Sequence, residues 1–158
     1  MLRAVFTLAV VLAGHCAAFS QSAERQTPIR DPDVFEFITL EQERPILDSF
    51  ARGLLLEEGR KGYILVYAGR NSCKGEARRV IGLIVAHMAK RHGLTGNRII
   101  GVDGGYRDRT VYEMWSVPYG EVAPVPTATV DPNEIKSLAP NSRRCRYLRA
   151  PVAGRRRT

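Results

Sequence analysis

The sequence predicts an α/β fold of the α+β sandwich type, with two helices packed on one small mixed sheet in the order β-α-β-α-β-β. Two segments carry apolar residues at helical spacing, and runs of β-prone residues lie before, between and after them. All of these segments fall within residues 33–118, so we expect one domain in the chain of 158 residues. The apolar share of 44% excludes a chain that is disordered throughout.

A short strand over 34–38 and an amphipathic helix over about 43–56 open the predicted domain. The apolar face of the helix consists of Ile46, Leu47, Phe50 and Leu54, with Asp48, Ser49 and Arg52 opposite. Pro45 is tolerated only in a first turn, so we expect the helix to begin close to it.

The central strand and the second helix follow. Residues 62–67 form a continuous β-prone run, which is typical of a strand covered on both faces. After a loop at 69–75, a helix is expected from Glu76 to about His92, with Gly93 ending it. Its buried stripe is Ala77, Val80, Ile81, Ile84 and Met88.

Two more strands complete the sheet, at 98–102 and 110–117, and we expect residues 103–105 (Asp-Gly-Gly) to form a turn between them. Beyond Pro118 the apolar periodicity disappears and Arg accumulates, and six of the nine prolines lie in 118–158. Residues 119–158 are therefore predicted to be a mostly disordered tail, and 21–32 a linker.

Residues 1–20 have the layout of a secretory signal peptide, with Arg3 before an apolar run and small residues after it. The run is about 10 residues long, against about 20 needed to span a bilayer. We expect cleavage near Ser20, a secreted or periplasmic mature chain and no transmembrane segment in it. A lipid anchor on Cys16 is disfavoured, because His15 stands where a small residue is required.

The net charge of +8 describes a neutral body with a cationic tail, because the whole surplus lies after Glu134. The predicted tail basic patch is Arg143, Arg144, Arg146 and Arg149. Outside the inner membrane such a patch suits an acidic envelope polymer, an anionic lipid or an envelope protein rather than nucleic acid. Two alternatives stay open: a basic end that only aids solubility, and nucleic-acid binding if residues 1–20 are retained.

Two cysteines, Cys73 and Cys145, remain after the predicted cleavage. In an oxidising compartment they are a disulfide candidate, the alternatives being two free thiols or pairing with a partner. A thiol-dependent enzyme with Cys73 as nucleophile is the alternative function. It would need a base, and His87 and His92 lie about one helix length away. With no other catalytic constellation, we expect a protein that is not an enzyme.

The loop at 69–75 is the best candidate ligand site, because it joins a core strand to a helix N-terminus, where unpaired N–H groups favour an anion. The candidate anion-binding residues are Arg70, Asn71, Ser72, Lys74 and Arg79. A solvated glycine-rich connection with ordinary surface charges is the alternative. No His or Cys spacing matches a zinc or haem motif, so the sequence predicts neither a metal site nor a cofactor.

Several stretches resemble the OmpA-like domain of bacterial envelope proteins. They are the strand at 62–67, the segment HGLTGNRI at 92–99, VDGGYR at 102–107 and EMWSVP at 113–118. The resemblance covers roughly 60–118 and implies a divergent secreted branch of that family, located in the cell envelope or at the outer membrane.

Typical members of that family bind the diaminopimelate carboxylate of peptidoglycan with an Asp after the central strand and an Arg in the following helix. In this sequence Arg70 lies near the Asp position, and Val80 stands at the Arg position with Arg79 beside it. The resemblance therefore implies an envelope module without the usual ligand pair, and peptidoglycan is only a weak expectation.

Overall fold

The structure is a computed structural model and describes residues 31–149. The predicted signal peptide and most of the predicted linker lie outside the described residues. The elements are β1 (Asp33–Glu36), α1 (Leu40–Leu56), β2 (Arg60–Ala68), β3 (Asn71–Ser72), α2 (Glu76–His92), β4 (Ile99–Tyr106), β5 (Val111–Pro118), the 3₁₀ turn η1 (Pro132–Glu134), β6 (Lys136–Ser137) and α3 (Arg143–Arg149). None of the helices in this part of the chain is long and apolar enough to cross a membrane.

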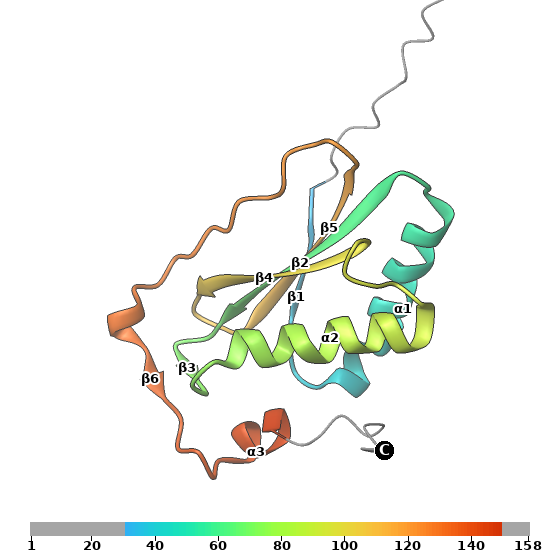
Figure 1. Cartoon of the computed structure of the whole chain (residues 1–158). Coiled ribbons are helices and arrows are strands. Elements are labelled where there is room, and N and C mark those ends of the chain that lie inside the picture. The colour runs from blue at the N-terminus through green and yellow to red at the C-terminus, as the bar shows by residue number, and fades with distance from the viewer. Residues whose placement is uncertain (1–30, 150–158) are drawn as a thin grey trace, which may run out of the picture.

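The main sheet has four strands in the order β1-β5-β2-β4. Its central strand β2 runs parallel to β4 and antiparallel to β5, so the sheet is mixed. Helices α1 and α2 lie side by side on one face of this sheet (Figure 1). Alternate residues of β2, Ile64, Val66 and Ala68, join the helices in the core. The predicted α+β sandwich is confirmed.

Helix α2 has the predicted bounds, whereas α1 begins earlier than predicted. Gly93 ends α2 in the left-handed region at φ 69°, where glycine carries no steric penalty. Helix α1 begins at Leu40 because the Thr39 hydroxyl caps it, accepting from the Gln42 N–H at 3.4 Å. Pro45 therefore lies inside the helix, where it removes one backbone hydrogen bond.

Residues 103–105 are not a turn, contrary to the prediction. They continue β4, and the pairing of β4 with β2 shifts by one residue between Val66 and Tyr67. Gly104 is required because the Tyr67 ring fills the space of a side chain, and a Cβ there would lie 2.5 Å from a ring carbon. Gly105 has φ 86°. The two glycines therefore mark a β-bulge and the close approach of Gly104 to the Tyr67 ring.

The segment 119–149 is ordered, so the prediction of a mostly disordered tail is wrong for these residues. The Thr127 N–H donates to the Tyr67 hydroxyl at 3.1 Å, and the Val130 N–H donates to the Tyr106 carbonyl at 3.2 Å. Strand β6 then pairs with β3, and α3 buries Cys145 and Leu148 in the core. Contacts that lie far apart in the sequence hold this segment in place, and such contacts leave no periodic pattern of apolar residues in the sequence. Residues 150–158 lie outside the described range.

Candidate functional site

A disulfide joins Cys73 in the loop before α2 to Cys145 in α3. The two Cα atoms are 5.6 Å apart, and both residues are almost fully buried. The predicted pairing of these cysteines is confirmed. The bridge leaves Cys73 without a thiol, so the alternative in which Cys73 acts as a nucleophile lacks its reactive group in this structure.

The anion expected at the N-terminus of α2 is supplied by the chain itself. The buried Glu76 carboxylate accepts from the Cys73 N–H at 2.8 Å and from the Thr110 hydroxyl at 2.6 Å. Arg144 closes the cluster, with its Nη2 2.7 Å from the Glu76 Oε1. This carboxylate therefore lies at the positive end of the helix, where the sequence predicts a bound anion.

Arg70 is also used internally. Its guanidinium pairs with Asp108 at 2.6 Å and with Glu134, and these hydrogen bonds raise the pKa of Arg70 above its ordinary value. Asn71 and Ser72 form β3 and pair with β6, with Ser72 buried and Asn71 exposed. Arg70 and Ser72 thus already have partners within the chain, Asp108 and Glu134 for Arg70 and the backbone of β6 for Ser72, and their role in binding a ligand stays a prediction.

Four of the other predicted cations are exposed. Arg143, Arg146 and Arg149 are exposed on α3, and Lys74 is exposed beside Cys73. Within residues 31–149 none of these four has an anionic partner. We call them the α3 basic surface.

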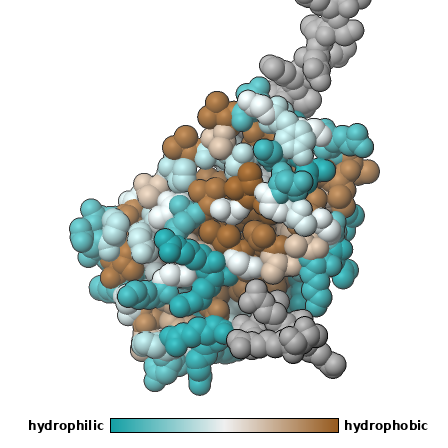
Figure 2. All heavy atoms as spheres, viewed as in Figure 1, coloured by the Kyte–Doolittle hydropathy of each residue, from teal (hydrophilic) through white to brown (hydrophobic). Residues whose placement is uncertain are grey.

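The disulfide keeps the α3 basic surface compact. Lys74 and Arg146 each follow a bridged cysteine, so their Cα atoms lie within roughly 13 Å of each other, given about 3.8 Å per residue. Hydrophilic side chains gather at the lower end of the molecule, where α3 lies (Figure 2). Arg79 is half-buried on α2 and likewise has no anionic partner among the described residues.

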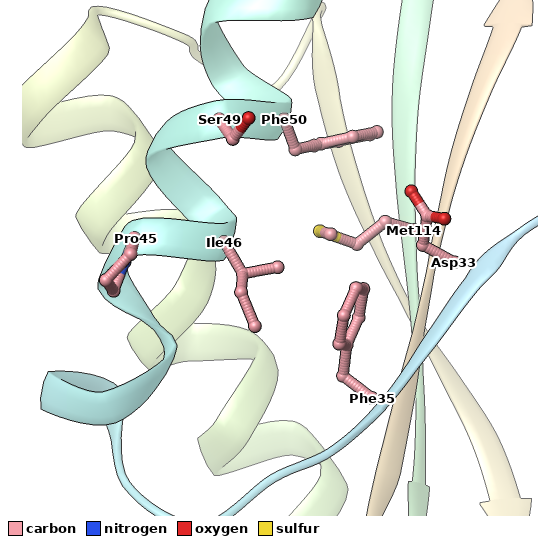
Figure 3. A pocket seen from close by; sticks show the side chains of 7 residues that line it. All are labelled: Asp33, Phe35, Pro45, Ile46, Ser49, Phe50 and Met114. Atoms are coloured by element: carbon pink, nitrogen blue, oxygen red, sulfur yellow. The ribbon is translucent and has the colours of Figure 1, made fainter.

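A cavity of about 520 Å³ lies between α1 and the strands β1 and β5. Phe35, Ile46, Phe50 and Met114 project into it, with Asp33 at its edge (Figure 3). Ile46 and Phe50 belong to the predicted apolar face of α1; they are half-buried and pack against the core.

A second polar cluster links the two long helices. The Asp48 Oδ1 on α1 lies 2.8 Å from the His87 Nε2 and 2.7 Å from the His92 Nε2, both on α2. The Arg91 Nε lies 3.1 Å from the other oxygen, Asp48 Oδ2. Hydrogen bonds from His92 and His87 hold the pKa of the Asp48 carboxyl well below its usual range.

The sequence gives little warning of this cluster, because no spacing of histidines or cysteines in it matches a metal motif. His87 and His92 are five positions apart, so they project from the helix axis at directions that differ by roughly 140°. This spacing matches no metal-binding motif. Asp48 was assigned to the polar face of α1, and only the packing of α1 on α2 brings it to the histidines. The remaining signal is that both described histidines fall in the second half of one helix.

The comparisons with protein-family models, curated proteins and solved structures found no match for this chain. The resemblance to OmpA-like domains therefore stays a prediction.

Proposed function

We propose that this chain is a secreted, non-enzymatic binding module of the cell envelope that holds an anionic envelope ligand on the α3 basic surface. The observation that carries the proposal is the contrast between paired and unpaired cations. Arg70 and Arg144 pair with carboxylates of the chain itself, whereas the disulfide anchors α3, on which Arg143, Arg146 and Arg149 are exposed. The layout of residues 1–20 supports the location outside the cytoplasm.

The expected strength of this interaction follows from the charge. Near an anionic lipid surface each Lys or Arg contributes about 1 kcal/mol, so the four cations of the α3 basic surface contribute about 4 kcal/mol. That free energy corresponds to a dissociation constant of about 1 mM for a single contact. Binding should therefore be weak, reduced by salt, and useful only on a ligand that repeats its charges, such as a membrane surface or a polymer.

Cosedimentation with lipid vesicles tests the proposal. The full chain is mixed at low ionic strength with vesicles of phosphatidylglycerol and phosphatidylcholine, or of phosphatidylcholine alone. We expect binding to the anionic vesicles only, and a drop of at least tenfold in the variant that replaces Arg143, Arg146 and Arg149 by Gln. The matched control replaces three exposed arginines elsewhere, Arg44, Arg52 and Arg109, and removes the same charge.

Two results would overturn this function. One is an equal loss in both triple variants, which would show that only net charge matters. The other is that duplex DNA binds more tightly than anionic vesicles through the same arginines while Met1 is still present on the cellular protein. That result would favour the alternative of a nucleic-acid binder. Purified sacculi included in the same assay test the weaker expectation of peptidoglycan binding.

A further inference from the structure

The Asp48, His87 and His92 cluster brings three metal-ligating atoms together at the junction of α1 and α2. The two Nε2 atoms and the carboxylate oxygen all lie within 4.8 Å of one another. The side chains are 15%, 8% and 12% exposed, so the cluster is shielded from water on most sides but still reaches the surface. Two helices contribute the donors, and no other part of the described chain is needed to complete the set.

These donors have the chemistry of a zinc site. Zinc binds imidazole nitrogen and carboxylate oxygen at about 2.0–2.2 Å, and three protein ligands plus a water form one of its ordinary tetrahedral arrangements. Ligand atoms in such a tetrahedron lie about 3.3 Å apart. The Asp48 oxygen is 2.7 and 2.8 Å from the two nitrogens, so each of these two distances lengthens by about half an ångström when an ion binds.

The orientation of the side chains brings the three donor atoms to a common point. Both histidines direct the same ring atom, Nε2, at the same carboxylate oxygen, Asp48 Oδ1. Arg91 holds the second carboxylate oxygen, which leaves Oδ1 as the ligand atom and fixes its direction. The Arg91 side chain is 65% exposed, so water screens its repulsion of an ion.

We propose that Asp48, His87 and His92 bind one Zn²⁺ ion, which clamps α1 to α2 and keeps its fourth position open to water or to a ligand. Each neutral imidazole then carries its proton on Nδ1 and donates the Nε2 lone pair, so no oxidant or reductant is needed. Magnesium and calcium are excluded as the favoured ions, because they prefer sites made of oxygen ligands. This proposal does not rest on the proposed function. Arg144 of α3 pairs with Glu76 at the start of α2, and His87 and His92 lie roughly 17 and 24 Å further along that helix at 1.5 Å per residue.

Equilibrium dialysis of the untagged full chain against Zn²⁺ tests the site, with bound metal measured by mass spectrometry. We expect one Zn²⁺ per chain, and a loss of affinity of at least roughly 100-fold in Asp48→Asn, His87→Gln and His92→Gln. That loss exceeds the 10- to 100-fold effect typical of removing an outer-shell group. The matched control is Glu58→Gln, which neutralises an exposed carboxylate just beyond the end of α1 and should leave binding unchanged.

A measurement on the unchanged chain covers the case in which the variants fail to fold. Co²⁺ should give the intense visible bands of a four-coordinate site without the absorption of a cobalt–thiolate bond, and Zn²⁺ should displace it. The proposal is overturned if the unchanged chain binds no Zn²⁺ at micromolar concentrations. It is also overturned if folded variants at the three positions bind as tightly as the unchanged chain, or if the control variant abolishes binding.

Discussion

Removing the disulfide should lower the free energy of unfolding by about 4 kcal/mol. The perturbation is the double variant Cys73→Ala/Cys145→Ala, which leaves no thiol at either position and keeps both positions apolar. The two residues are 72 positions apart, and in the chain-entropy model a loop of that length accounts for about 4 kcal/mol. Domains are typically stable by about 5–15 kcal/mol, so this loss is a large share of the total.

Urea unfolding followed by the fluorescence of Trp115, the only tryptophan, measures the loss. With a slope of about 2 kcal/mol per molar urea, the midpoint should fall by about 2 M at an unchanged slope. The unchanged chain treated with a reductant should behave like the variant. A loss below about 1 kcal/mol would refute the reasoning, because the loop would then be closed by contacts that persist in the unfolded chain. Uptake of two alkylating labels without reduction would show that the bridge does not form.

Three further predictions concern the packing around the sheet. Glu76→Ala should cost about 3 kcal/mol of unfolding free energy in urea, because it leaves the buried Cys73 N–H and Thr110 hydroxyl, and the partly buried Arg144, without their acceptor. A cost under about 1 kcal/mol would contradict the role given to this carboxylate. Gly104→Ala should cost about 1–3 kcal/mol of unfolding free energy, because the added Cβ overlaps the Tyr67 ring. Gly82→Ala is the control: no atom lies within 4 Å of a Cβ added there, and the change should raise the melting temperature slightly. Equal effects of the two substitutions would contradict the close approach of Gly104 to Tyr67. Burial and the Glu43 carboxylate raise the pKa of Tyr112 above its usual value near 10. The tyrosine therefore ionises first in the unfolded chain, and the free energy of unfolding should fall above about pH 10. Tyr112→Phe should make that fall smaller in unfolding curves measured from about pH 8 to 11.

Local signals predicted the elements that local forces determine. The stripe from Ala77 to Met88 and the stop at Gly93 were enough to give the bounds of α2, because a helix of that length with one apolar face has few alternatives. The start of α1 was missed because a threonine cap outweighed the cost of one proline inside the helix. The glycines of β4 were wrongly assigned to a turn, because β-bulges and tight turns both favour glycine.

The candidate site depended on pairs that are distant in sequence. Arg70 looked available for a ligand because Glu134, 64 residues later, belonged to a segment without periodicity. Glu76 showed no sign of its role, since only the fold places Thr110 and Arg144 against it. The disulfide was predictable, because an even pair of cysteines is itself a long-range signal.

Because α3 lies late in the sequence, the disulfide can form only after most of the chain has been synthesised. The Tyr147 hydroxyl accepts from the Leu40 N–H at 2.6 Å, so this hydrogen bond joins the beginning of the domain to its end. At about 5–20 residues per second, the ribosome delivers Cys145 about 4–14 s after Cys73. During that interval Cys73 is an unpaired thiol in a chain whose core is still open. A chain cut off before residue 145 keeps that thiol and exposes it to cross-linking with other chains, so an intact bridge marks a molecule whose synthesis has reached α3.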